Sequence, residues 1–214
     1  MLYPSPWLLK GQGVILTHSF KKSWIKNNGF IPDHMKNNFI GGLSFTMLVD
    51  YQESNCGPYK ELLFIPGLFR VRNRNHLVIT KIYVDSEESL QSGRKNWGIP
   101  KELAEISWIQ DHSTLSFSAH DNNDLILKAK FRLNPFYFPL SSQLSPFHIY
   151  QELNDQCYLF KPNGYGRAAL CKLKGLDSSP DLFPKLSESR FCTAMHVKNF
   201  DLYFPCSKIE RLYM

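Results

Sequence analysis

Hydrophobic and polar residues alternate with a period of two in the middle of the chain. In residues 114–120, leucine, phenylalanine and alanine alternate with threonine and serine, and in 125–132 apolar residues alternate with lysine and arginine. Successive side chains of a strand point to opposite faces, so each segment predicts a strand with one buried and one solvated face. The Asp-Asn-Asn-Asp sequence between them is typical of a turn, which predicts a hairpin.

Shorter apolar or alternating segments predict further strands at 12–18, 43–51, 59–65, 68–72, 76–84, 104–110, 167–174, 191–197 and 200–204. Segments rich in proline, glycine, asparagine or serine separate these strands. They are predicted to form an extended N-terminal arm (3–9), a loop (24–38), a long aromatic loop (134–154) and a linker (176–186).

One helix is predicted from Ser86 to about Lys95. Asp85 is a candidate N-cap, Glu88 lies three residues further on, as in a capping box, and the Gly-Ile-Pro sequence at 98–100 would end the helix. Many strands with one or two short helices indicate an α+β, mostly β protein. We expect a β-barrel or a two-sheet fold, formed by a single domain over residues 1–214.

Composition excludes several classes of protein. The five cysteines are odd in number and none is in a C-x-x-C spacing, which argues against a disulfide framework and against a structural zinc site. Nucleotide-binding glycine motifs and metal-type histidine spacings are absent from the sequence, so we expect no cofactor and no metal. Aromatic residues reach 14%, a content that suits strands and the walls of an apolar cavity.

Charge and hydropathy suggest no special partner. Lysine and arginine total 25 against 19 acidic residues, giving a net charge of +6, but the basic residues are scattered along the sequence. An ordinary solvated surface is the expected interpretation, with no nucleic acid and no membrane as partner; a nucleic-acid-binding surface is the least favoured alternative. A leader-type N-terminus and a membrane-length apolar run are absent, which predicts a soluble, cytoplasmic protein.

The segment Gly-Arg-Lys-Asn-Trp-Gly-Ile-Pro-Lys-Glu-Leu-Ala at 93–104 carries the candidate chemistry. Its Lys101 follows a tight Gly-Ile-Pro turn and has apolar neighbours in Trp97, Ile99 and Leu103. Such neighbours would partly remove water from the amine, and desolvation disfavours the ammonium form. A neutral amine can attack a ketone or aldehyde to form a Schiff base. On the residues alone, an ordinary surface lysine at the start of a strand remains the simpler interpretation.

Two segments resemble the acetoacetate decarboxylase superfamily. They are Gly-Pro-Tyr-Lys-Glu at 57–61 and the Gly-Arg to Pro-Lys segment at 93–101, in the version that reads Trp-Gly-Ile-Pro-Lys-Glu-Leu-Ala. The resemblance implies that Lys101 is the Schiff-base nucleophile and that Glu61 is a carboxylate of the same pocket. It also implies the family's β fold around an apolar pocket, a carbonyl or keto-acid substrate, and a homo-oligomer.

This chain departs from the decarboxylase pattern at two places. The family has a second lysine directly after the nucleophile, where this chain has Glu102. A carboxylate near Lys101 would favour the ammonium, unless Glu102 points to the other face of the strand. The family also uses an N-terminal arginine for the substrate carboxylate, whereas this chain offers Lys10 and has no arginine before Arg70. Acetoacetate itself is therefore not the expected substrate.

Three further residues are candidate substrate contacts. Arg94 could bind a carboxylate or hold the end of the helix, Trp97 could wall the pocket or fill the core, and Tyr59 could line the cavity. Together with catalytic Lys101 and Glu61, they predict a lyase that forms an imine with a keto acid or other carbonyl compound, for decarboxylation or aldol-type chemistry. The alternative is a non-catalytic β-barrel that binds an apolar small molecule.

Overall fold

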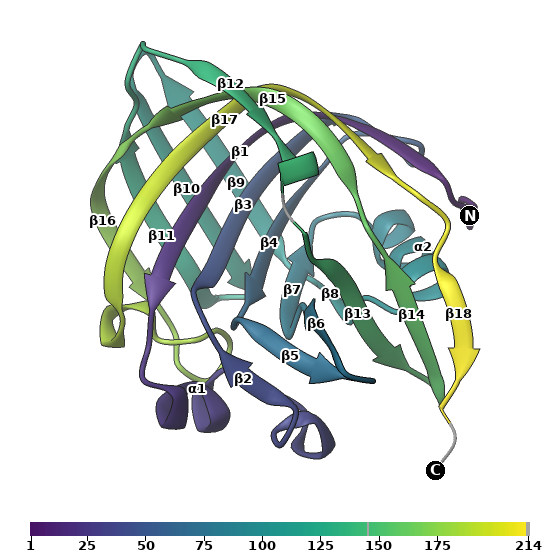
Figure 1. The fold of residues 1–214 in the computed structure, drawn as a ribbon. Coiled ribbons are helices and arrows are strands. Elements are labelled where there is room, and N and C mark those ends of the chain that lie inside the picture. Colours follow the sequence, from purple (N-terminus) through teal and green to yellow (C-terminus); the bar gives the residue numbers. More distant parts are fainter. Residues whose placement is uncertain (145, 213–214) are drawn as a thin grey trace.

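Three sheets make up the part of the chain that the computed structural model describes, residues 1–212 except 145 (Figure 1). The largest has eight strands in the order β12-β15-β17-β1-β3-β4-β7-β8. Their bounds are β12 Phe138–Ser141, β15 Asn163–Leu170, β17 Arg190–Phe204, β1 Trp7–Ser19, β3 Ser44–Glu53, β4 Tyr59–Ile65, β7 Lys81–Val84 and β8 Lys101–Leu103. All neighbours in this sheet pair antiparallel except β7 and β8, which are parallel.

Two smaller sheets flank it. The four-stranded sheet has the order β16-β11-β10-β9 and the six-stranded sheet the order β18-β14-β13-β6-β5-β2. The first comprises β16 Lys172–Ser178, β11 Asp124–Arg132, β10 Thr114–Asp121 and β9 Glu105–Asp111. The second comprises β18 Lys208–Arg211, β14 Gln156–Phe160, β13 His148–Leu153, β6 Arg74–Leu77, β5 Leu68–Val71 and β2 Phe39–Gly41. The helices are α1 (Lys22–Asn28), α2 (Glu87–Trp97) and the 3-10 turns η1 (Asp33–Met35), η2 (Ser142–Leu144) and η3 (Leu186–Glu188).

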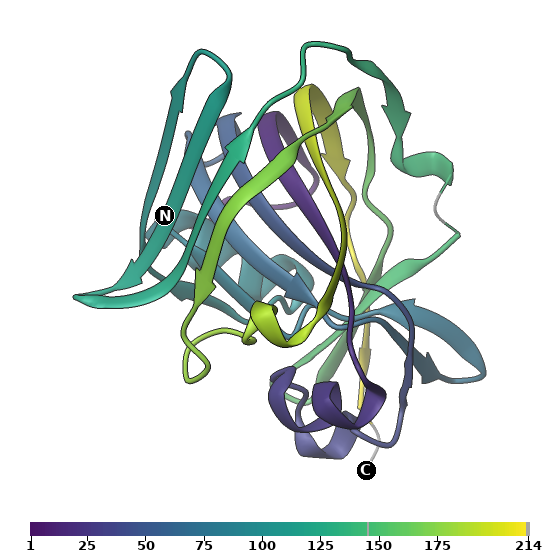
Figure 2. The same ribbon diagram turned by 90° about the vertical axis from the view of Figure 1, so that its left-hand side faces the viewer.

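The two faces of the eight-stranded sheet support separate cores. One face packs against the four-stranded sheet (Figure 2). Leu16 and Phe64 of the large sheet belong to the same core as Phe117 and Phe131 of the small one. The alternation seen in the sequence places Phe117 and Phe131 on this buried side. The opposite face packs against α2, and this second core contains Trp97 together with residues of β1, β4, β7 and β14. The strands between the cores are therefore buried on both sides.

The mostly β, α+β class predicted from the sequence is confirmed. The barrel alternative is not, because the described strands form three sheets and no closed barrel. The predicted hairpin of β10 and β11 is confirmed, and Phe117 lies opposite Ala129 in it. Helix α2 begins and ends slightly later than predicted: Ser86, not Asp85, is the N-cap, and its Oγ accepts a hydrogen bond from the Ser89 amide at 3.2 Å.

Several loop predictions were wrong. The predicted loop at 24–38 contains most of α1 and all of η1, and the predicted aromatic loop contains β12, η2 and β13. The linker predicted at 176–186 overlaps β16 and η3 only at its two ends, and residues 179–185 lie outside both. The N-terminal arm is extended as predicted and joins the sheet from Trp7, where β1 begins. Proline lacks a backbone donor but is tolerated at a sheet edge, as at Pro139 in the edge strand β12. Pairing with distant strands thus overrode the local composition.

Candidate functional site

The side chain of Lys101 lies on the α2 side of the eight-stranded sheet, at the start of β8. Parallel pairing of β8 with β7 places Lys101 beside Ile82, which belongs to the same core as α2. The residue is only 4% exposed. A buried lysine requires partners for its charge or must lose its proton, so its immediate contacts decide what it can do.

Glu61 is the principal partner of this amine. The Lys101 Nζ lies 2.9 Å from Glu61 Oε2 and donates to Ser89 Oγ at the same distance. Tyr51 donates its hydroxyl to the other carboxylate oxygen, Oε1, at 3.3 Å. The Nζ also lies 5.1 Å from the centroid of the Tyr59 ring, which gives a cation–π contact. Both catalytic candidates from the sequence are thus brought together, although 40 positions separate them.

Gly93 explains why the helix can cover the amine so closely. A Cβ at this position would lie 2.8 Å from both Cδ and Cε of Lys101 and 3.4 Å from its Nζ. Only the absence of a side chain lets this turn of α2 rest on the aliphatic stem of the lysine. The glycine of the Gly-Arg to Pro-Lys segment therefore has a direct packing role at the amine.

Glu102 points to the other face of the strand. Its carboxylate pairs with Lys81 of β7, at 2.7 Å between Nζ and Oε1, and the Lys81 side chain is 13% exposed. The Lys81 ammonium also lies over the rings of Tyr83 and Phe30, at 4.8 and 5.2 Å from their centroids. The residue that replaces the family's second lysine is therefore neutralised by a different lysine and does not touch Lys101.

The three predicted substrate contacts have different surroundings. Tyr59 is buried beside the amine, as described above. Arg94 is exposed and donates its Nε to the backbone carbonyl of Lys101 at 2.9 Å, so it ties α2 to β8. Trp97 is buried in the core, packs edge-on against Trp7 with 5.2 Å between centroids, and donates its Nε1 to the Pro205 carbonyl at 2.7 Å. Lys10 is exposed and pairs with Glu53.

Sequence reasoning missed Tyr51 and Ser89, both of which contact the Lys101–Glu61 pair. Tyr51 lies opposite Tyr59 in the pairing of β3 with β4, so strand register would have indicated it. Burial raises the pKa of both tyrosines well above the ordinary value, and the nearby Glu61 charge acts in the same direction. Both phenols therefore remain protonated, and Tyr51 serves as a hydrogen-bond donor to the carboxylate.

The amine of Lys101 is covered, because Lys101 and Glu61 are each only 4% exposed. Two cavities of the described residues lie elsewhere, one of about 390 Å³ over the four-stranded sheet and one of about 180 Å³ between the first residues and the start of α2. Neither is lined by Lys101 or Glu61. Within residues 1–212 except 145, histidine, cysteine, aspartate and glutamate do not form a group of three that could hold a metal ion. The same residues contain no helix long and apolar enough to cross a membrane.

Solved structures with the same fold include enzymes. The chain superimposes on an acetoacetate decarboxylase from Legionella pneumophila with a TM-score of 0.68 and 14% identity, over 97% of this chain and 88% of that one. A second acetoacetate decarboxylase structure gives 0.72 and 13% over 100% and 92%. The enduracididine biosynthesis enzyme MppR, complexed with pyruvate, gives 0.67 and 11% over 98% and 91%. Likeness at these identities establishes the fold.

Curated relatives match a shorter part of the chain. The protein NEOXANTHIN-DEFICIENT 1 of Arabidopsis thaliana is 26% identical over 106 residues, which is 48% of this chain and 36% of the relative. Its counterpart from Solanum lycopersicum is 28% identical over the same length, at 48% and 35%. The match thus spans about a third of the length of these relatives. The family model for acetoacetate decarboxylase matches residues 4–161, which contain both candidate segments, and the chain therefore belongs to the acetoacetate decarboxylase family.

Proposed function

We propose that this protein is an enzyme that forms a Schiff base between Lys101 and a small carbonyl compound, with a keto acid as the first substrate class to test. The observation that carries the proposal is the buried Lys101–Glu61 pair, with 2.9 Å between Nζ and Oε2. An amine beside a carboxylate in a site with little water has a proton acceptor within reach. Membership of a family whose structural neighbours include enzymes supports the same interpretation.

The pair can supply both proton steps of imine formation. Glu61 takes a proton from the Lys101 ammonium, and the neutral amine then attacks the carbonyl carbon of the substrate. Return of that proton to the oxygen gives a carbinolamine, which loses water to form the protonated imine. The imine then accepts the electron pair of the bond from the neighbouring carbon to the group that leaves. Carbon dioxide is released from a β-keto acid; an aldehyde is released from an aldol, whose hydroxyl proton passes to Glu61. Protonation at carbon and hydrolysis regenerate the lysine.

Access to the amine requires movement of its cover. Ser89 and Gly93 of α2 lie against Lys101, and the N-terminal segment lies over the helix, with the Tyr3 amide donating to Ser92 Oγ at 3.0 Å and Asn96 donating to the Tyr3 carbonyl at 2.8 Å. A carbonyl substrate must enter between these elements. We infer that displacement of the N-terminal segment or of α2 precedes imine formation.

Borohydride trapping tests the proposed chemistry. Pyruvate, acetoacetate and a panel of larger keto acids are each incubated with the protein and sodium borohydride, and peptides are mapped by mass spectrometry. We expect a reduced adduct on Lys101 and none in Lys101→Met. Lys81→Met is the matched control, because it removes another carboxylate-paired lysine, which is partly buried, and should leave the Lys101 adduct in place. An intact protein that gives no Lys101 adduct with any member of the panel would contradict the proposal.

A second candidate is non-catalytic binding of an apolar small molecule. It is favoured by one observation: the amine is fully engaged by Glu61, Ser89 and the Tyr59 ring, and the described cavities do not reach it. Native mass spectrometry of freshly purified protein distinguishes the two. A retained apolar ligand together with an untrapped Lys101 would support binding over catalysis.

A further inference from the structure

Cations of two strands that are distant in the sequence meet on one face of the four-stranded sheet. Lys128, Lys130 and Arg132 occupy alternate positions of β11, and all three are exposed, whereas the residues between them are buried. Lys172 of β16 lies directly opposite Arg132. These four residues, here called the basic face, lie on the outer side of the sheet, away from the eight-stranded sheet. Exposed Lys174, at the irregularity between β11 and β16, adds a fifth positive charge beside them.

Most of this charge has no neutralising partner. Within the described residues, Lys128 alone of the basic face forms an ion pair, at 3.5 Å with Asp177, and both side chains are about 60% exposed. Four further carboxylates lie at the margins of the sheet: Glu105 and Asp111 at the two ends of the edge strand β9, and Asp121 and Asp124 at the turn between β10 and β11. The positive charge is therefore concentrated on β11 and β16.

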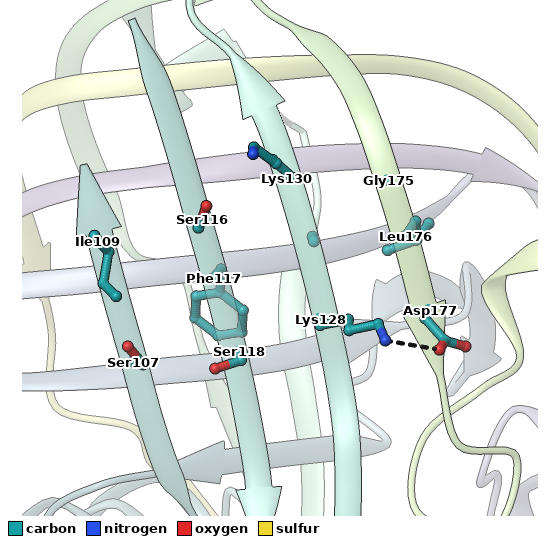
Figure 3. Close-up of a pocket in the computed structure, with 11 residues that line it drawn as sticks. Ser107, Ile109, Ser116, Phe117, Ser118, Lys128, Lys130, Gly175, Leu176 and Asp177 are labelled. Atoms are coloured by element: carbon teal, nitrogen blue, oxygen red, sulfur yellow. Dashed lines mark ion pairs between the residues drawn. The ribbon is translucent and has the colours of Figure 1, made fainter. Parts of the chain in front are cut away.

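A hollow of about 390 Å³ lies beside the basic face (Figure 3). Figure 3 shows Ser116 and Ser118 of β10 between Ile109 of β9 on one side and Lys128 and Lys130 on the other. The serine hydroxyls can donate to phosphate oxygens. The Ile109 side chain is an exposed apolar group, with the residue 63% exposed. Cationic, hydroxyl and apolar groups thus lie side by side on one open surface.

We propose that the outer face of the four-stranded sheet is a docking surface for an anionic phospholipid membrane. Cations at alternate strand positions are about 7 Å apart, so they form a row and do not converge on one point. A row of this kind complements a plane of many phosphate and carboxylate charges better than it complements a single free anion. Exposed Ile109 at the same surface can enter the interfacial region of the lipid.

The positive charge of the basic face also complements nucleic acid, but the side chains on the outer face of the sheet favour lipid. Single-stranded nucleic acids are held by aromatic side chains on which the bases stack. Of the aromatic residues of this sheet, Phe117 and Phe131 are buried in the core, and half-buried Trp108 packs against it, edge-on to Phe117. In the described strands, the outer face presents aliphatic, hydroxyl and charged groups instead. This peripheral docking differs from the expectation, drawn from the sequence, that no membrane is a partner.

Vesicle co-sedimentation tests this surface. Vesicles of phosphatidylcholine, with and without an equal amount of phosphatidylserine, are mixed with the full chain at low and at physiological salt. We expect binding only to the anionic vesicles, weakened by salt. The triple variant Lys128→Gln, Lys130→Gln, Arg132→Gln should bind roughly 100-fold more weakly, because each basic residue contributes about a fivefold change and the three factors multiply.

A matched control removes the same charge elsewhere. The variant Lys21→Gln, Lys22→Gln, Lys26→Gln loses three cations at α1 and should bind nearly as well as the unaltered chain. Circular dichroism confirms that both variants fold. Absence of binding by the unaltered chain, or equal losses in both variants, would overturn the proposal. So would tighter binding to a single-stranded oligonucleotide at the same salt, or a dimer that dissociates only in the β11 variant, since these outcomes identify a different occupant.

Discussion

At the scale of single residues, the site depends on one buried ion pair whose members each require the other. Removing one partner of such a pair leaves a charge without compensation in the interior, which typically costs about 3–5 kcal/mol. Glu61 also accepts from Tyr51, and Lys101 also donates to Ser89, so each has a second contact that survives loss of the first. The pair can therefore be tested through stability, independently of any substrate.

We expect Glu61→Gln and Lys101→Met each to lower the free energy of unfolding by about 3 kcal/mol. The double variant should lose less than the sum, because no unpaired charge remains, and this gives a coupling of at least about 1 kcal/mol in a double-mutant cycle. Urea denaturation of the unaltered chain, the two single variants and the double variant measures this coupling energy. Additive losses would show that the two charges do not interact in the folded protein.

The Gly93→Ala variant should change the reactivity of the Lys101 amine much more than the stability of the fold. The new Cβ would meet the stem of Lys101 at 2.8 Å, so the amine must shift away from Glu61, while alanine improves helix propensity by about 1 kcal/mol. We expect the free energy of unfolding to change by less than about 1.5 kcal/mol and the rate of borohydride trapping to fall roughly 100-fold. Unchanged trapping would mean that α2 does not position the amine.

At the scale of elements, α2 is the cover of the site and its ends are well defined. Ser86 caps the N-terminus, and Gly98 ends the helix with φ of +62°, a left-handed conformation that favours glycine. A Cβ at Gly98 would also lie 2.3 Å from the ring of Tyr158, so β14 and the helix end are in close contact there. Both features keep Ser89 and Gly93 in register with Lys101.

Loss of the N-cap should therefore weaken the helix and loosen the cover. Ser86→Ala is expected to lower the free energy of unfolding by about 1 kcal/mol, since the Ser89 amide loses its acceptor. Ser187→Ala, at an exposed serine of η3, is the control and should stay within about 0.5 kcal/mol. Chemical denaturation measures both. Equal effects of the two substitutions would contradict a capping role for Ser86.

At the scale of the whole molecule, two buried histidines make stability depend on pH. Burial lowers the pKa of His18 and of His196 from 6.5 to about 4. The His18 Nδ1 lies 2.9 Å from Ser189 Oγ, whose own hydrogen is directed to the Leu186 carbonyl, so the neutral ring donates to the serine. The Nε2 atoms of both histidines are buried without a hydrogen-bond partner in the described structure. Protonation would place a charge in the core.

The sign of the pH effect follows from proton binding. Between pH 6.5 and 4 the unfolded chain binds protons at both histidines while the folded chain does not, so stability falls as pH falls through this interval. We expect a lower urea midpoint at pH 5 than at pH 7. His196→Gln should flatten this dependence, and His112→Gln, at an exposed turn, should not. Equal midpoints at pH 5 and 7 in the unaltered chain would contradict the prediction.

Resemblance to the family identified the two segments that carry Lys101 and Glu61. Local patterns in the sequence by themselves determined the strand-rich class, the hairpin of β10 and β11, and helix α2. These features depend on side-chain alternation, capping and turn residues, whose physical causes act between near neighbours in the chain. Sequence reasoning also predicted that Glu102 could point away from Lys101, because successive strand residues face opposite sides.

Only the tertiary structure decided which residues contact the Lys101–Glu61 pair and which distant strands pair with each other. Tyr51 and Ser89 reach the pair through strand pairing and helix packing, Lys81 neutralises Glu102 from a neighbouring strand, and proline-rich segments become strands because distant edges accept them. The basic face likewise gains Lys172 only after β11 and β16 pair, since residues 40 positions apart then lie opposite each other. Contacts between such distant residues leave no local periodicity in the sequence, so the folded chain alone reveals them.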